Sequence, residues 1–371
     1  MYDMARGMDD VISLTVGEPD FKTPASIIEV SNRCFSEGMT AYTPNNGLYE
    51  LRKAVADYCS PITGYEVDPD KEVMITVGAQ EALVVAMQIL LDPGDDVMLC
   101  EPYYVSYLGQ IHVCGCNPVF VPTSEENRWV PTVEDLERTV TDRTRVMIIN
   151  SPNNPTGCEI SREELKKIAE FAIRHDIVVI SDEPYNKIRY SETPFVSISS
   201  MPGMKERTLV VNSFSKTYAM PGWRLGYAVG PEWIISQMPK THDVTVSCVP
   251  APFQHAGAFA LKNCDKDVEE MVRRFRIRRD LVVEGINSIP GLSCSAPDGT
   301  FYLFFNIKEL GVSSEEFAFG LLEDKHVALV PGNGFGDLGE GYMRLTFAKD
   351  EEDLTEAISR IREYVEKIRN K

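Results

Sequence analysis

One lysine stands in a polar turn between two apolar segments, where its amine could take part in covalent chemistry. Lys216 follows Ser213 and Ser215, and Arg224 comes eight residues later. An amine close to apolar walls loses hydration, which lowers its pKa and makes it a nucleophile. Two hydroxyls and a guanidinium nearby would suit a phosphate group. A solvated surface lysine is the usual case for a single lysine, so motifs elsewhere must decide between the two interpretations.

Three other apolar segments also end in polar or glycine-bearing motifs. They are residues 73–77 before Gly78-Ala79-Gln80, residues 146–150 before SPNNPTG, and residues 177–181 before Asp182-Glu183-Pro184-Tyr185. In parallel α/β sheets, ligands bind beyond the carboxyl ends of the strands. We therefore expect these three motifs and the lysine turn to converge on one crevice.

Each motif also has an ordinary structural interpretation. Gly78 suits a plain strand-to-helix turn, although such a turn can also aim free helix N–H groups at an anion. Asp182 at the end of a buried strand could cap a turn, and Tyr185 could belong to the core. Arg344 interrupts an apolar strand, where its guanidinium needs a carboxylate that a structural Asp or Glu could supply. One shared site explains all of these residues together better than several separate structural roles do.

The elements that must position these motifs alternate between strands and helices. Apolar strands are predicted at residues 73–77, 97–100, 119–121, 146–150, 177–181, 209–212 and 225–229. A helix is predicted after Ser161, which has capping-box spacing to Glu164. Strands that alternate with helices predict a mostly parallel sheet covered on both faces. The predicted fold class is therefore α/β, with a mostly parallel seven-stranded sheet between helices.

The segments on either side of this alternation follow a different pattern. A short strand is predicted at 11–16, helices at 25–38 and 48–58, a long helix after about residue 265, a helix capped by Ser313 and Glu316, and strands at 300–307 and 343–348. We predict a large domain over residues 44–270. A smaller α+β domain is predicted from residues 1–43 together with residues 271–371.

Composition disfavours several classes of partner. The net charge of −19 argues against nucleic acid, because binding to phosphates relies on lysine and arginine. A basic run at 273–279 is interpreted as the solvated face of a long helix, balanced by Glu269 and Glu270. No apolar run has the length needed to span a membrane.

The nine cysteines are scattered along the chain. They form no CxxC pair, and there is no His-rich cluster, so no metal site is predicted. Reduced thiols are typical of a cytoplasmic protein, and this is the expected location.

Four motifs together give the chain a resemblance to a known family. They are YTPNNGLYELR at 42–52, SPNNPTG at 151–157, SDEPY at 181–185 and NSFSKTYAMPGWRLGY at 212–227. The chain resembles the class I/II aminotransferases, which are pyridoxal 5′-phosphate (PLP) enzymes of fold type I. It is most similar to the branch that contains aspartate, aromatic and broad-specificity aminotransferases. The resemblance covers nearly the whole chain.

The resemblance implies a catalytic role for three residues. Lys216 would hold PLP covalently and then move a proton at the substrate's α-carbon. Asp182 would pair with the pyridinium nitrogen and keep it protonated, so that the ring can accept electrons. Tyr185, together with Asn154, would donate hydrogen bonds to the 3′ oxygen of the ring.

It also implies the groups that bind the rest of the cofactor and the substrate. Arg344 would clamp the substrate α-carboxylate, helped by Asn154 and by backbone near Gly17. Tyr104 would stack on the ring, and Tyr42 would reach the phosphate in a neighbouring subunit, which implies a homodimer. The remaining cofactor-binding residues would be Gly78, Ala79, Gln80, Ser213, Ser215 and Arg224.

Three residues or segments depart from the family pattern, and the first of them bears on the substrate. Gln80 stands where some members that use acidic substrates carry a lysine, which weakens the case for a dedicated aspartate enzyme. Pro184 replaces the usual aliphatic residue, and the segment ahead of Val11 is shorter than usual. The expected donor is thus an aromatic amino acid, aspartate or a broad range of amino acids.

The expected activity is ping-pong transfer of an α-amino group from an L-amino acid to a 2-oxo acid such as 2-oxoglutarate or pyruvate. An alternative is a PLP-dependent carbon–sulfur β-lyase, because it would share the lysine, the aspartate and the phosphate groups. A non-catalytic PLP-binding regulatory module is disfavoured, since Lys216, Asp182, Arg224 and Arg344 are all present and no DNA-binding domain is appended.

Overall fold

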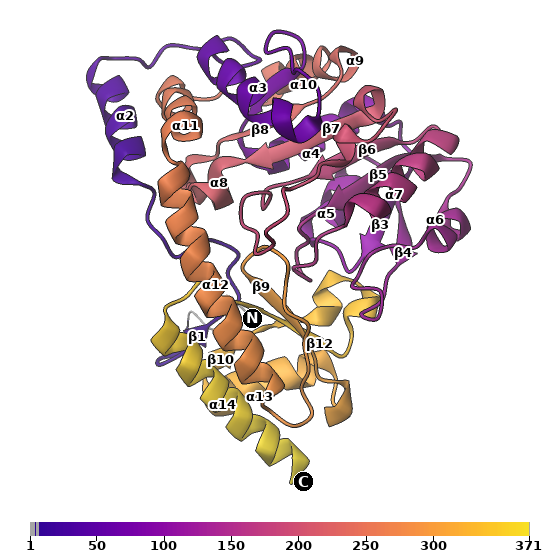
Figure 1. Cartoon of the computed structure of the whole chain (residues 1–371), viewed down its shortest axis with the longest axis vertical. Coiled ribbons are helices and arrows are strands. Elements are labelled where there is room, and N and C mark those ends of the chain that lie inside the picture. The colour runs from indigo at the N-terminus through magenta and orange to yellow at the C-terminus, as the bar shows by residue number, and fades with distance from the viewer. Residues whose placement is uncertain (1–3, 5–6, 371) are drawn as a thin grey trace.

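The seven apolar segments predicted as strands form one sheet in the order β2-β8-β7-β6-β5-β3-β4 (Figure 1). The computed structural model describes residue 4 and residues 7–370. Strand β8 runs antiparallel to β2 and β7, and the other pairs are parallel, so the sheet is mostly parallel as predicted. The strands are β2 (Val73–Thr76), β3 (Asp96–Glu101), β4 (Asn117–Pro122), β5 (Thr144–Asn150), β6 (Val178–Asp182), β7 (Thr208–Ser213) and β8 (Gly226–Val229).

Helices cover both faces of this sheet because alternate side chains of each strand enter different cores. On β2, Val73 and Ile75 join one core, whereas Met74 joins another. One face is covered by α4 (Gly78–Leu90), α5 (Ser106–Val113), α9 (Glu232–Ile235) and α10 (Met238–Thr245). The other is covered by α3 (Tyr49–Thr63), α6 (Val133–Thr139), α7 (Arg162–Arg174) and α11 (Ala251–Asn263). Helix α2 (Ala25–Ser36) packs against α11.

A second group of elements lies at the other end of the long helix α12 (Asp265–Asn287), as Figure 1 shows. Strands β11 (Val330–Pro331), β12 (Tyr342–Thr346) and β9 (Tyr302–Asn306) form an antiparallel sheet in that order. Strand β1 (Ile12–Ser13) pairs in parallel with β10 (Val327–Ala328), and is shorter than the predicted 11–16. The helices here are α13 (Ser314–Lys325) and α14 (Glu351–Arg369). Short 3₁₀ helices lie at Ile198–Ser200, Lys205–Arg207, Pro221–Trp223, Lys308–Leu310, Gly332–Phe335 and Asp337–Gly339.

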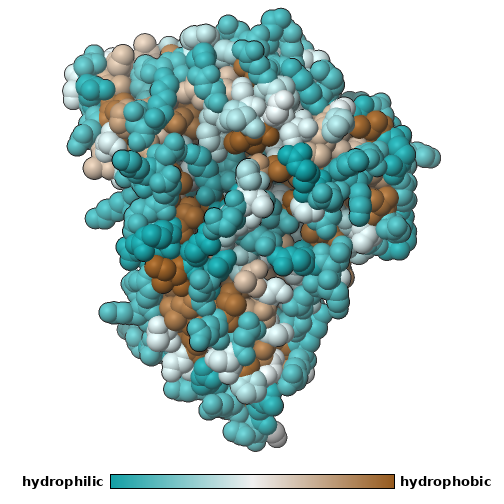
Figure 2. All heavy atoms as spheres, in the orientation of Figure 1, coloured by the Kyte–Doolittle hydropathy of each residue, from teal (hydrophilic) through white to brown (hydrophobic). Residues whose placement is uncertain are grey.

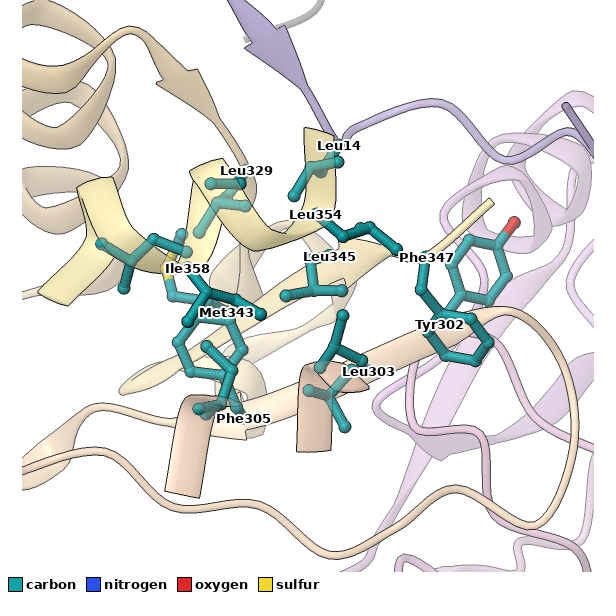
Figure 3. Packing of buried hydrophobic residues seen from close by; sticks show 14 of the residues in the cluster. Leu14, Tyr302, Leu303, Phe305, Leu329, Met343, Leu345, Phe347, Leu354 and Ile358 are labelled. Atoms are coloured by element: carbon teal, nitrogen blue, oxygen red, sulfur yellow. The ribbon is translucent and has the colours of Figure 1, made fainter. Parts of the chain in front are cut away.

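The N-terminal segment is held in the core of this second group. Leu14 packs among side chains of β9, β12 and α14, including Leu345 and Leu354 (Figure 3). The backbone N–H of Thr346 donates to the carbonyl of Leu14 at 2.9 Å. The first residues after β1 are thus fixed next to β12, which carries Arg344.

Several local predictions are confirmed, and one needs correction. Capping boxes at Ser161 and Ser313 begin α7 and α13 as predicted. The basic run on α12 is largely solvated, but Arg278 is only 2% exposed. Its guanidinium donates to Asp20 at 2.8 Å and to Glu351 at 3.1 Å. The sequence of α12 could not reveal this, because both partners lie on distant segments.

The face shown in Figure 2 is largely hydrophilic, with hydrophobic residues in small groups. Within residue 4 and residues 7–370, no helix combines the length and the apolar composition needed to cross a bilayer. The division into domains at residues 43/44 and 270/271 stays a prediction.

Candidate active site

A cavity of about 310 Å³ lies beyond the carboxyl ends of β5, β6 and β7, and the predicted motifs converge on it. The predicted site residues that line it are Gly17, Ala79, Gln80, Tyr104, Asn154, Asp182, Tyr185, Ser213, Ser215, Lys216, Arg224 and Arg344. Gly78 lies just behind this wall against Arg224. Tyr42 does not line the cavity and is 90% exposed.

Lys216 lies in the short helix α8 (Phe214–Thr217), directly after β7. The Ser213 hydroxyl accepts from the N–H of Ser215 at 3.2 Å and so caps this helix. The Lys216 Nζ donates to the carbonyl of Gly17 at 2.5 Å. Burial lowers the pKa of Lys216 to about 8, because the charged ammonium loses hydration. Part of the amine is therefore neutral, and nucleophilic, close to physiological pH.

Asp182 ends β6 and presents its carboxylate to the cavity. Its Oδ2 accepts a 2.5 Å hydrogen bond from the hydroxyl of Tyr107, on α5. Its Oδ1 is buried and has no hydrogen-bond partner within the described part of the chain. Burial raises the pKa of Asp182 to about 6, although the bond from Tyr107 and the charge of Lys216 oppose this shift. A buried carboxylate oxygen without a partner next to open space indicates a position for a donor from a ligand.

The turn between β2 and α4 packs closely against Arg224. Gly78 has φ +75°, and a Cβ on it would lie 2.5 Å from Nη2 of Arg224. Gly226 lies beneath the turn, where a Cβ would lie 2.8 Å from the nitrogen of Ala79. Gly226 is needed because backbone atoms leave no room for a side chain, and Gly78 is needed because residues with a Cβ rarely adopt its φ. N–H groups at the start of a helix lack intrahelical acceptors, so this end of the cavity suits an anion.

Arg344 enters the cavity from β12 and is buried. Its Nη1 donates to Oδ1 of Asn154 at 3.0 Å, and its Nη2 donates to the carbonyl of Thr15 at 2.7 Å. The guanidinium carbon lies 4.5 Å from the ring centre of Tyr302. Burial lowers the pKa of Arg344. No carboxylate of the described residues forms an ion pair with it, so the structural partner considered for Arg344 above is not found.

Tyrosines form much of the remaining wall. The hydroxyls of Tyr185 and Tyr302 lie 3.2 Å apart. The Nε2 of Gln80 donates to the hydroxyl of Tyr104 at 3.0 Å, and the ring centres of Tyr104 and Tyr107 lie 5.4 Å apart in an edge arrangement. These contacts fix the orientation of the aromatic wall.

Three residues at the site were missed by reasoning from sequence. Tyr107 bonds Asp182, and Tyr302 lies beneath Arg344. Asn150 lines the cavity and donates from Nδ2 to the carbonyl of Asp182 at 2.9 Å. A signal existed for Asn150, a polar residue at the end of an apolar strand. The sequence carried no comparable signal for the two tyrosines, which look like core residues.

The family profile described as "Aminotransferase class I and II" matches residues 9–361. The chain belongs to the class I and II aminotransferases. It is 44% identical to an aspartate aminotransferase of Pyrococcus abyssi over 97% of this chain and 93% of that protein. It is 41% identical to aromatic-amino-acid aminotransferase 2 of Thermococcus litoralis, with the same coverage. Among solved structures, the aromatic aminotransferase from Pyrococcus horikoshii OT3 superimposes with a TM-score of 0.94, at 42% identity, over 99% of this chain and 98% of that one.

The class I and II aminotransferases are PLP-dependent transaminases, and the residues around the cavity fit this cofactor. A neutral amine such as that of Lys216 suits an aldehyde carbon. The unpartnered Oδ1 of Asp182 suits a protonated ring nitrogen. The glycine turn beside Arg224 suits a phosphate. All three features face one cavity.

Proposed function

We propose that this protein moves the α-amino group of an L-amino acid to a 2-oxo acid by a ping-pong exchange. One observation carries the proposal. The buried guanidinium of Arg344 has no carboxylate partner within the described residues and shares a cavity with Lys216 and Asp182. A buried arginine without an anion is costly, so a ligand carboxylate at this position would satisfy it. Amino acids and 2-oxo acids both carry one next to the reacting carbon.

We assign Lys216 two tasks in this reaction. Bound PLP supplies a ring that accepts electrons from the substrate's α-carbon. Lys216 provides the amine that holds the cofactor between turnovers and then serves as the base and acid for the proton at the α-carbon. Its pKa of about 8 suits both tasks, because proton transfer is efficient when the pKa lies near the working pH. The Gly17 carbonyl keeps the amine aimed at the cavity.

Asp182, Tyr185 and Asn154 would set the properties of the ring. The free Oδ1 of Asp182 is proposed to accept from the protonated ring nitrogen, and Tyr107 would keep this carboxylate ionised. Tyr185 and Asn154 are proposed to bond the 3′ oxygen. Tyr104 would cover one face of the ring.

The phosphate would lie at the α4 turn, held by six residues of the turn and of the segment that carries Lys216. They are Gly78, Ala79, Gln80, Ser213, Ser215 and Arg224. Arg344 would grip the substrate carboxylate with two parallel hydrogen bonds, and Asn154 and Gly17 would help to orient it.

The substrate range is proposed to be broad and to include aromatic amino acids. The only side-chain cations that line the cavity, within the described residues, are Lys216, Arg224 and Arg344, and each has a proposed task already. Gln80 is neutral and its amide is engaged by Tyr104. A second carboxylate, as in aspartate, thus meets no dedicated cation from this chain. The relatives include proteins named for both aspartate and aromatic substrates.

We further propose a homodimer in the cytoplasm. Tyr42 is 90% exposed and does not line its own cavity, which is compatible with a contact to the phosphate in a partner subunit. Arg224 is itself exposed, so this end of the cavity is open for such a contact. All nine cysteines are free, as expected for thiols in a reducing compartment. A Tyr42→Phe variant should bind PLP more weakly while the dimer, measured by sedimentation, stays intact.

The test is a panel of amino donors with 2-oxoglutarate or pyruvate as acceptor, with the new amino acid measured by chromatography. We expect transfer from aromatic donors and a weaker preference for aspartate. Lys216→Ala should lose transfer, and Arg344→Gln should raise KM for amino acids far more than it changes binding of PLP. Transfer at full rate by Lys216→Ala would contradict the proposal. So would release of pyruvate and ammonia from cystathionine as the only reaction.

A further inference from the structure

A carboxylate in the first turn of α4 is bonded to a fully buried histidine on the side away from the cavity. Oε1 of Glu81 lies 2.6 Å from Nδ1 of His242, on α10. The His242 side chain has no exposed surface and that of Glu81 is 14% exposed. Neither residue lines the cavity. The two positions are 161 residues apart in sequence, so this contact ties α10 to the start of α4.

The other oxygen of Glu81 holds the backbone of the turn itself. Oε2 accepts from the N–H of Val77 at 2.6 Å, and Val77 is the residue just before α4. The hydroxyl of Thr76 donates to the carbonyl of Gly78 at 3.0 Å. The first bond fixes the Thr76–Val77 peptide, and the second fixes the Gly78–Ala79 peptide, whose N–H lies in the first turn of α4. One N–H of the turn is thereby used by the protein, and those that follow remain available to a ligand.

The turn between β2 and α4 has little freedom to adjust if the bond from the Val77 N–H to Glu81 is lost. Arg224 packs on Gly78 and Gly226 packs beneath Ala79, as described above. A shift of the Val77 peptide would therefore move the helix N–H groups relative to the Arg224 guanidinium. Anion binding at such a site requires both groups to point at the same atoms.

We infer that Glu81, anchored by His242, is a positioning residue for recognition of the cofactor phosphate. It fixes the Thr76–Val77 peptide at the start of the turn so that the first-turn N–H groups and Arg224 face one anion. The bond to His242 holds the carboxylate away from the cavity, where its negative charge would otherwise oppose phosphate binding. This inference rests on the proposed placement of the phosphate at the α4 turn.

The experiment compares PLP with pyridoxal, which lacks the phosphate. Dissociation constants of both are measured by equilibrium dialysis against PLP-free protein. The lysine amine and the ring contacts are common to both compounds. The ratio, the dissociation constant of pyridoxal divided by that of PLP, therefore reports the phosphate site alone. In the wild type, PLP should bind much more tightly than pyridoxal.

Glu81→Ala should reduce this ratio about 10-fold, chiefly through weaker PLP binding, because Val77 loses its acceptor. Glu81→Gln keeps an acceptor oxygen for Val77 and should recover most of the ratio. Glu232→Ala is the matched control, since Glu232 lies in the first turn of α9 and pairs with Lys71 at 3.3 Å on the surface. It should leave the ratio unchanged.

The partner residue gives a second test that does not depend on folding of Glu81→Ala. His242→Leu should lower the ratio, and His242→Asn, whose amide nitrogen can take the place of Nδ1, should restore it. A folded Glu81→Ala or His242→Leu protein with the wild-type ratio overturns the inference and leaves the proposed function intact. A wild type that binds PLP and pyridoxal equally would overturn the placement of the phosphate as well.

Discussion

Two neighbouring carboxylates at the end of β6 lie in opposite surroundings. Asp182 faces the cavity, with one oxygen bonded to Tyr107 and the other free. Glu183 points the other way, where its Oε1 accepts from Ser181 at 2.7 Å and from Ser197 at 2.6 Å. Its Oε2 is buried without a partner in the described chain and does not adjoin the cavity.

The difference shows how to interpret a buried carboxylate that lacks a partner. Burial raises the pKa of Glu183 to about 7 and that of Asp182 to about 6. Glu183 is enclosed by protein, which disfavours the charged form, so its carboxyl group keeps a proton up to near neutral pH. Asp182 adjoins open space, so an incoming cation can satisfy its charged form. The same carboxylate chemistry thus gives a group enclosed by protein on one side of the strand and a group that faces a cavity on the other.

The largest effect is expected from paired substitutions of these two residues. Asp182→Asn removes the charge proposed to face the ring nitrogen and should reduce kcat/KM about 1,000-fold. Glu183→Gln is close in shape to a protonated glutamic acid and should change kcat/KM less than about threefold at pH 7. Steady-state kinetics of both variants at saturating PLP measure this contrast. Equal losses in the two variants would contradict the assignment of different roles.

A second contrast concerns stability as a function of pH in the PLP-free protein. Both pKa values are raised by folding, so between about pH 4 and pH 7 the native state binds more protons than the unfolded chain. Stability from these groups is therefore greatest below pH 4 and falls as the pH rises through 6 and 7. A shift of two pKa units corresponds to about 3 kcal/mol.

Urea denaturation of PLP-free wild type, Asp182→Asn and Glu183→Gln at several pH values tests this expectation. Each variant should lose less stability than the wild type over the interval from pH 4 to pH 7. A variant with the full wild-type slope would show that its carboxylate has an ordinary pKa. Saturating PLP should reduce the contribution of Asp182 to the dependence of stability on pH. The contribution of Glu183 should stay unchanged.

The smallest effect is expected from the hydroxyls that bond the two carboxylates. Tyr107→Phe removes a donor to the ionised Asp182 and should lower kcat/KM about 10-fold. The apparent pKa of the acidic limb of the pH profile should rise, because the bond from Tyr107 lowers the pKa of Asp182. Ser197→Ala removes a donor to Glu183 and should cost about 1 kcal/mol of stability while kcat/KM stays near that of the wild type. An unchanged pH profile for Tyr107→Phe would mean that this bond does not control the ionisation of Asp182.

The convergence of the four motifs on one cavity could be predicted from sequence because each motif follows its own strand. Apolar runs located all seven strands, and the rule for parallel sheets brought Ala79, Asp182 and Lys216 together. The antiparallel direction of β8 was not predicted, since a strand's own residues do not encode the direction of its neighbours.

Side-chain contacts between residues far apart in the sequence could not be predicted. Tyr107 meets Asp182 across 75 residues, and Arg278 meets Asp20 across 258 residues. A tyrosine on an amphipathic helix and an arginine in a basic run look like core and surface residues until their partners are known. The role of Glu183 was equally hidden, because only the fold shows which side of β6 adjoins the cavity.

The path of the N-terminal segment has a consequence for how the enzyme is made. Its carbonyls at Thr15 and Gly17 accept from Arg344 and Lys216, and the first of these bonds joins residues 329 positions apart. During synthesis the early part of a chain emerges and folds first. Lys216 and the turn between β2 and α4 can thus be assembled while the residues that become β12 are still to be added. The ability to bind an amino acid, for which we propose that Arg344 is required, is then among the last properties that the growing polypeptide acquires.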